Sequence, residues 1–167
     1  MIENGVAQWP RERMAVVGSS LGGYYATWLA ENCGCKAVLL NPAVNPARDL
    51  ARYVGELTHW HNPAESFFFK AEYVNEVKSL ERQGLTHPGQ YFAVIAKGDE
   101  VLDWREMAAR YRGANLKLLQ GSDHALSDFE DHLGEILNFL QISCPPPGNE
   151  GGDINDTFSA PFSGRFP

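Results

Sequence analysis

The chain has 167 residues, with 14 basic and 21 acidic side chains and a formal net charge of −7 at pH 7. This is the composition of an ordinary globular protein, and the acidic balance argues against nucleic acid or an anionic membrane surface as a partner, because both favour clustered Lys and Arg. No apolar run approaches the roughly 20 residues of a membrane span, and the first residues do not resemble a secretory signal. We therefore expect a cytoplasmic protein.

Residue types that bind metals form no site in the sequence. Cys33, Cys35 and Cys144 are an odd number of cysteines, which is typical of a reducing cytoplasm, and their spacing is not that of a zinc site. His59 and His61 form an H-x-H pair, but no third ligand is evident. We therefore predict no metal site.

Apolar segments rich in Val, Ile and Leu predict the strands of a sheet. They show little alternation between apolar and polar residues, which is typical of strands buried on both faces of a parallel sheet. The segments are 14–18, 36–41, 91–96 and 115–120.

Helical spacing of apolar residues occurs between these strands. The first helix follows Gly23 and ends at Gly34, and further helices are expected over 70–83, 104–112 and 127–140. Ser127 and Glu130 form a capping box that would begin the last helix. Alternating strands and helices predict an α/β fold with a parallel sheet.

Two further parts of the chain stand apart from this alternation. The segment 42–90 is too long for one crossover, and we interpret 45–88 as an insertion, which either covers a pocket or forms a satellite core. Its aromatic residues Trp60, Phe67 and Phe68 are candidates for lining a pocket. From Cys144 onward the chain is rich in Gly, Asn, Asp, Ser and Pro, so we expect one domain over 1–143 and a disordered tail over 144–167.

A G-x-S-x-G motif, formed by Gly18, Ser20 and Gly22, lies between the first strand and the first helix. This is the setting of a nucleophile elbow, in which the serine occupies a sharp, strained turn. We expect that side chains at positions 18 and 22 would collide where strand and helix fold back, and that glycine avoids the collision. The backbone N–H of Leu21, at the start of the helix, is placed to stabilise an oxyanion.

A serine nucleophile needs a base, and the base needs a carboxylate to orient it. Asp99 follows the strand 91–96 and His124 follows the strand 115–120, which is the order serine, acid, histidine found in this architecture. Because ligands bind at the carboxyl edge of open α/β sheets, we expect Ser20, Asp99 and His124 to meet there.

Other assignments stay open at this point. Glu100 or Asp103 could be the acid in place of Asp99, and Ser20 could be only a helix cap. His59, His61, His87 and His132 compete with His124, although His132 is expected on a solvated face of the last helix. The turn at 18–23 could also bind a nucleotide phosphate, but its spacing is neither G-x-G-x-x-G nor that of a P-loop.

Four blocks of sequence resemble the YqiA/YcfP-like esterases, a small group of bacterial α/β-hydrolases. They are V-G-S-S-L-G-G-Y-Y-A-T-W-L-A at 17–30, L-N-P-A-V at 40–44, G-D-E-V-L-D at 98–103 and G-S-D-H-A at 121–125. The resemblance implies hydrolysis of carboxylic esters, or of thioesters, without a metal or an organic cofactor. It also implies an acyl-enzyme on Ser20, with His124 as base and Asp99 as orienting acid.

One departure from that family concerns the start of the chain. Family members begin with a strand that ends in a His-Gly-Phe loop, which supplies the second oxyanion donor. No His-Gly pair occurs here, so we expect an N-terminally truncated α/β-hydrolase-like sheet that lacks on the order of 60 residues. A short form of the family that builds its oxyanion hole differently is the alternative. The strand 14–18 would then have an unpaired apolar edge, which a second copy of the chain could cover. The alternative function is that of an inactive relic acting as a binding module.

Overall fold

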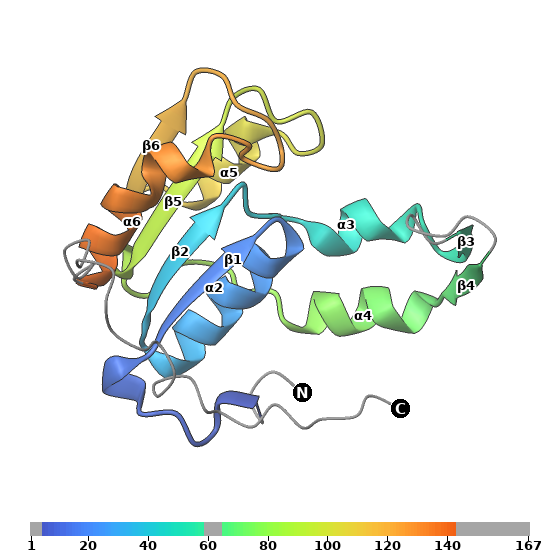
Figure 1. Ribbon diagram of the computed structural model, residues 1–167. Coiled ribbons are helices and arrows are strands. Elements are labelled where there is room, and N and C mark those ends of the chain that lie inside the picture. The colour runs from blue at the N-terminus through green and yellow to red at the C-terminus, as the bar shows by residue number, and fades with distance from the viewer. Residues whose placement is uncertain (1–4, 59–64, 143–167) are drawn as a thin grey trace, which may run out of the picture.

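A four-stranded parallel sheet forms the body of the computed structural model, which describes residues 5–58 and 65–142 (Figure 1). The strands lie in the order β1-β2-β5-β6, and every neighbouring pair is parallel. Their bounds are Ala15–Ser19 for β1, Lys36–Leu40 for β2, Tyr91–Ala96 for β5 and Asn115–Leu119 for β6. The structure therefore confirms the α/β fold and the four strands predicted from the sequence.

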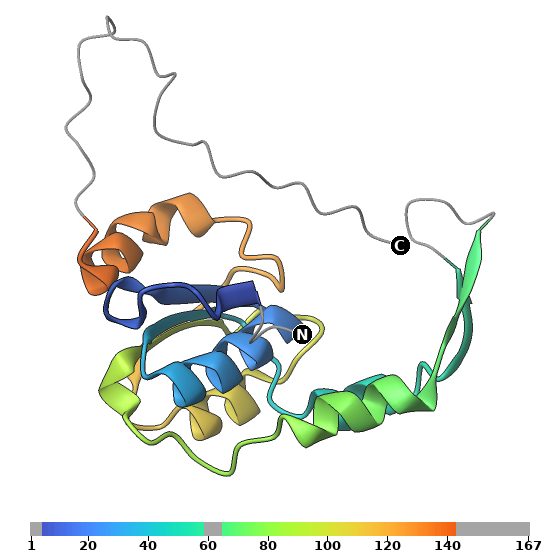
Figure 2. The same cartoon turned by 90° about the horizontal axis from the view of Figure 1, so that it is seen from below.

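Helices cover both faces of this sheet (Figure 2). On one face, α2 (Leu21–Cys33) and α5 (Trp104–Arg110) pack their apolar residues, such as Ala30 and Met107, against Leu39 and Ile95 of the central strands. On the other face, α6 (Leu133–Leu140) packs Ile136 against Val38 and Val94. As expected, α2 ends where Gly34 adopts the left-handed conformation, with φ 71°.

Burial distinguishes the central strands from the outer ones. Every residue of β5 is buried, as is most of β2. The expectation that all four strands are buried on both faces is wrong for β1 and β6, where Val17 is 55% exposed and Leu116 and Leu118 are also exposed. These strands lie at the edges of the described sheet, where helices cover less of each face. An apolar run alone does not distinguish an edge strand from a central one.

The start of the last helix also differs from its prediction. Phe129–His132 form a 3-10 turn, and α6 begins only at Leu133. The capping box of Ser127 and Glu130 does not form, because the backbone N–H and the hydroxyl of Ser127 donate to the Asp123 carboxylate at 2.9 and 2.6 Å. Within this tighter turn His132 faces inward toward Asp128 and is only 7% exposed, so its expected solvated position is wrong.

Most of the segment predicted as an insertion forms an arm that projects from the body (Figures 1 and 2). It consists of α3 (Pro46–Ala51), the antiparallel pair β3 (Gly55–Thr58) and β4 (Ser66–Phe69), and α4 (Ala71–Ser79). Its base is fixed to the body by Val77, which packs with Tyr24 and whose carbonyl accepts a hydrogen bond from the Tyr24 hydroxyl at 2.9 Å. The residues predicted as a tail, 144–167, lie outside the described ranges.

Two glycines allow the start of α2 to lie close to β1 and to the segment after β2. A Cβ at Gly18 would lie less than 3.0 Å from backbone atoms of Gly22 and Gly23, and a Cβ at Gly23 would lie as close to Pro42. The expected collision at position 22 is wrong, because a Cβ there would meet nothing within 4 Å. Gly22 is exposed on the first turn of the helix. Its backbone lies close to Gly18, but a side chain at position 22 would point away from that contact.

Substitution by alanine is expected to destabilise the protein at Gly18 but not at Gly22. Gly18→Ala should lower the free energy of unfolding by more than about 3 kcal/mol, because the backbone of α2 must move away from β1. Gly22→Ala should change it by no more than about 1 kcal/mol, since alanine is accepted in a helix. Urea denaturation of the two variants measures both values, and an equal loss in the two would contradict the contact described here.

Candidate active site

Ser20 lies in the turn between β1 and α2 with an unusual backbone conformation, φ 52° and ψ −122°. Hydrogen bonds hold this turn against the end of β2. The Ser20 N–H donates to the Leu40 carbonyl, and the Ser20 carbonyl accepts from the Ala43 N–H, both at 2.9 Å. The Gly23 N–H donates to the same Ser20 carbonyl at 3.0 Å. The predicted sharp turn is therefore present, and Ser20 has no side-chain hydrogen bond of a helix cap.

Three side chains from separate loops form a hydrogen-bonded chain at the carboxyl edge of the sheet. The Ser20 Oγ lies 3.0 Å from His124 Nε2, and His124 Nδ1 lies 3.0 and 2.9 Å from the two carboxylate oxygens of Asp99. An ionised carboxylate only accepts hydrogen bonds, so with Asp99 in this form Nδ1 would donate and Nε2 would be left to accept from the serine hydroxyl. This is the arrangement in which imidazole acts as a general base toward serine.

Asp99, rather than Glu100 or Asp103, faces the imidazole. The Asp99 side chain is fully buried, and its Oδ1 also accepts from the backbone N–H groups of Val101 and Leu102 at 2.8 and 2.9 Å. Asp103 instead caps α5 by accepting from the Arg105 N–H at 2.9 Å.

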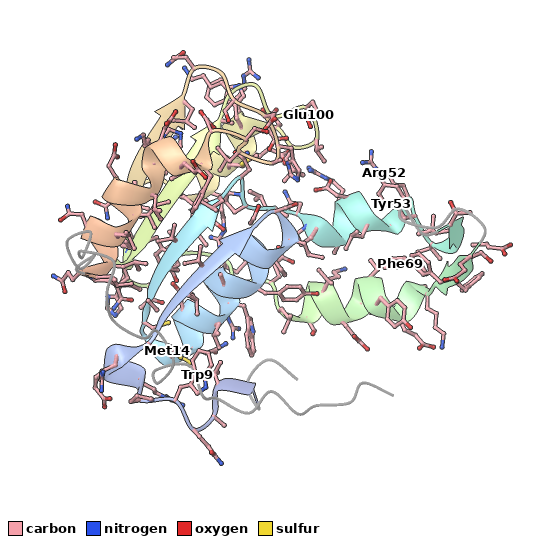
Figure 3. The ribbon with its side chains drawn as sticks, in the orientation of Figure 1. Trp9, Met14, Arg52, Tyr53, Phe69 and Glu100 are labelled. Atoms are coloured by element: carbon pink, nitrogen blue, oxygen red, sulfur yellow. The ribbon has the colours of Figure 1, made fainter. Side chains whose placement is uncertain are left out.

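Glu100 has a different place, beside the backbone of the histidine loop. Its carboxylate accepts from the His124 backbone N–H at 3.0 Å, at the loop end of the sheet (Figure 3). The structure therefore brings Ser20, Asp99 and His124 together as predicted, and it adds Glu100 as a contact of the histidine backbone.

The loop that carries His124 is held by hydrogen bonds among its own side chains. Ser127 donates to Asp123, and Ser122 donates to Asp128. These hydrogen bonds lower the pKa of Asp123 and the pKa of Asp128 below their usual range. Asn41, which directly follows β2, donates to the backbone carbonyls of Asp123 and His124. Sequence reasoning did not identify Asn41, although its place after a central strand marks the same edge of the sheet.

The first turn of α2 offers an anion-binding backbone group beside Ser20. Within the described residues, the N–H of Leu21 has no hydrogen-bond acceptor, as expected for the first residue of a helix. The helix dipole adds partial positive charge at this end. The prediction that the Leu21 N–H donates to an oxyanion stays a prediction, and the structure places this N–H in the residue that follows Ser20, at the start of α2.

The aromatic residues predicted to line a pocket lie far out in the fold. Phe67 and Phe68 belong to β4 and are 40% and 62% exposed, and Tyr53 and Phe69 mark the same outer part of the arm (Figure 3). A cavity of about 390 Å³ lies at the base of the arm and includes Tyr24 and Val44 in its lining, but neither phenylalanine.

Other predicted site residues lie outside the described structure. These are Trp60 of the predicted pocket and the H-x-H pair, His59 and His61. In the described residues, no group of three or more His, Cys, Asp or Glu side chains could hold a metal ion. No helix in these same ranges has the length and apolar character needed to cross a membrane.

A family model described as "Uncharacterised protein family (UPF0227)" matches residues 1–141. The chain belongs to this family. The match agrees with the resemblance to YqiA/YcfP-like esterases that the sequence blocks carry, and it covers all three members of the serine, histidine and aspartate chain.

Solved structures show that this UPF0227 member has the α/β-hydrolase fold. An alpha/beta superfamily hydrolase from Oenococcus oeni PSU-1 aligns with a TM-score of 0.54 and 14% identity, over 84% of this chain and 72% of that one. Est1E from Butyrivibrio proteoclasticus, with ferulic acid bound, aligns with a TM-score of 0.53 and 16% identity, over 75% of this chain and 57% of that one. A structure of the metagenome-derived lipolytic enzymes LipS and LipT aligns with a TM-score of 0.53 and 17% identity, over 76% of this chain and 64% of that one. The UPF0227 chain thus spans less than two thirds of the latter two.

The strained turn at Ser20 yields a prediction about stability. A non-glycine residue in such a backbone region costs about 1–3 kcal/mol, whereas glycine adopts it readily. Ser20→Gly should therefore be more stable than Ser20→Ala by about 1 kcal/mol, after allowance for the greater freedom of glycine in the unfolded chain. Both variants lose the hydroxyl, so their difference in urea unfolding isolates the backbone. A glycine variant no more stable than the alanine variant would show that the turn is unstrained.

Proposed function

We propose that this UPF0227 member is a serine hydrolase that acts on carboxylic esters through an acyl-enzyme on Ser20. The observation that carries the proposal is the continuous chain from the Ser20 hydroxyl through both nitrogens of His124 to the buried Asp99 carboxylate. The family match and the α/β-hydrolase fold support it, as does the likeness to lipolytic enzymes. Thioesters undergo the same chemistry and are the alternative substrate class.

In the proposed mechanism each group has one task in acylation. His124 Nε2 takes the proton of Ser20 as the Oγ attacks the carbonyl carbon of the ester. Asp99 holds the Nδ1 proton and stabilises the imidazolium, and the Leu21 N–H donates to the oxyanion of the tetrahedral intermediate. When this intermediate collapses, the alkoxide leaves and receives the proton from Nε2.

Deacylation repeats these steps with water. His124 Nε2 removes a proton from a water molecule, whose oxygen attacks the acyl carbon, and the second tetrahedral intermediate is stabilised by the same N–H. Its collapse breaks the bond to Oγ, which regains its proton from Nε2. The carboxylic acid leaves, and the Ser20 hydroxyl is restored with no net change in the protein.

Covalent labelling tests whether Ser20 is an activated nucleophile. A fluorophosphonate is attacked at phosphorus by the serine Oγ, with loss of fluoride, so intact-mass analysis should show one adduct on the unmodified protein. Ser20→Ala should show none, whereas Ser19→Ala, which removes the adjacent exposed hydroxyl of β1, should still react. No adduct on folded protein would contradict the proposal and favour a non-catalytic binding module on the same fold.

Replacing the acid provides a second test of the same mechanism. In Asp99→Asn, an amide N–H group facing Nδ1 would favour the tautomer in which Nε2 carries the proton, so the imidazole could not accept from Ser20. We expect kcat for a short-chain p-nitrophenyl ester to fall by roughly 10²–10⁴-fold, with a much smaller change in KM. The matched control is Asp103→Asn, because the Asp103 carboxylate caps α5 and pairs with the Arg105 side chain at 3.5 Å instead of facing His124. Equal losses in both variants would exclude Asp99 as the orienting acid.

A further inference from the structure

We propose that Asn41 is a positioning residue, whose buried amide fixes the backbone of His124 and thereby aligns the imidazole with Ser20. This inference rests on the proposed function, because it assigns to Asn41 the task of holding the general base. The Asn41 side chain bonds to the backbone of the loop that carries the histidine and to the backbone at the end of β5.

The amide of Asn41 is completely buried, with 0% of its surface exposed, and each of its polar atoms is paired. Its Oδ1 accepts from the Ala96 backbone N–H at 2.8 Å. Its Nδ2 donates to the carbonyls of Asp123 and His124 at 2.9 and 3.1 Å. Because Oδ1 must face an N–H and Nδ2 must face two carbonyls, only one orientation of the amide satisfies all partners. A buried group matched in this way strongly restricts the loops it joins.

The peptide groups on both sides of the His124 Cα are therefore held. The His124 carbonyl accepts from Asn41, while the His124 N–H donates to the Glu100 carboxylate at 3.0 Å. The loop is also pressed against the one that carries Asp99, since a Cβ at Gly98 would collide with the Ser122 carbonyl. With these restraints the imidazole reaches Ser20 Oγ at 3.0 Å, a distance that a shift of about 1 Å in the loop would break.

The same short segment also fixes the nucleophile. Leu40, which precedes Asn41, accepts from the Ser20 N–H, and Ala43 donates to the Ser20 carbonyl, both at 2.9 Å. Asn41 adopts φ 41°, a left-handed conformation that asparagine tolerates better than most residues. Residues 40–43 thus hold the backbone of both partners in the Ser20–His124 hydrogen bond. Leu40 and Ala43 hold Ser20, and Asn41 holds His124.

Two substitutions separate alignment from general stability. Asn41→Ala removes the whole amide, whereas Asn41→Asp keeps an oxygen for the Ala96 N–H but removes both donors to the histidine loop. The matched control is Thr27→Val, which removes two buried hydrogen bonds in the core beneath α2. Thr27 Oγ1 lies 2.8 Å from the Tyr111 hydroxyl and donates to the Gly23 carbonyl at 2.9 Å. All three variants are expected to lower the melting temperature.

Only the Asn41 variants should lower reactivity when rates are expressed per folded molecule. We expect the second-order rate of fluorophosphonate labelling, and kcat for a short-chain p-nitrophenyl ester, to fall by about 10–100-fold, with KM changed by less than about twofold. Asn41→Asp should lose at least as much as Asn41→Ala, because its carboxylate faces two carbonyl oxygens. Labelling at the unmodified rate in either variant, or an equal loss in Thr27→Val, would overturn the inference.

A spectroscopic measurement keeps this test separate from the proposed function. The His124 Nδ1 proton shared with Asp99 should give a low-field proton NMR signal, which Thr27→Val keeps and Asn41→Ala loses. An unmodified protein that shows the signal but never reacts with the fluorophosphonate would contradict the esterase proposal, while loss of the signal in Asn41→Ala would still support positioning by Asn41. A signal that is unchanged in Asn41→Ala would overturn that positioning.

Discussion

The candidate site depends on the strained turn at Ser20, whose conformation is imposed by its surroundings. At φ 52° and ψ −122° the turn is unfavourable for serine, and such strain persists only where neighbouring structure over-determines it. Here Leu40 at the end of β2 and Ala43 just after it bind the Ser20 N–H and carbonyl, and Gly18 lets α2 return closely enough for these bonds to form. The direction of the serine hydroxyl is thus set by the packing of β1, α2 and β2 together, before any substrate is present.

Burial differs between the two side chains proposed as acid and base. The Asp99 side chain is fully buried and accepts from two backbone N–H groups besides the imidazole, so its orientation is fixed from within the fold. The His124 side chain is 22% exposed, which leaves the base accessible from the side of the solvent. Because electrostatic interactions are stronger away from water, the buried carboxylate acts on the imidazole more effectively than an exposed one would. This gradient suits a base that must be held rigidly yet still meet a substrate.

The sequence predicts the parts of this fold that depend on patterns local to the chain. Runs of apolar residues locate the four strands, and the order of Ser20, Asp99 and His124 after three of them predicts their meeting, because parallel strands end at one edge. The predictions that fail concern which strand lies at the edge of the sheet and the direction in which a side chain would point. Exposure of Val17 depends on which strand is outermost, and the freedom at Gly22 depends on where a Cβ would point at the start of a helix. Neither quantity is encoded by the spacing of residue types.

Asn41 shows why supporting residues are harder to find than reacting ones. Serine, histidine and aspartate are conspicuous because their types and their order along the chain match a known motif of this architecture. The side chain of Asn41 instead bonds only to backbone groups, which every residue possesses, and these lie 55 to 83 positions away along the chain. The residue types at Ala96 and Asp123 therefore give no indication of the contact, because Asn41 bonds to their backbone atoms. The amide becomes meaningful only when the ends of β2 and β5 and the loop after β6 are brought together, where a buried polar group must find partners for every one of its atoms.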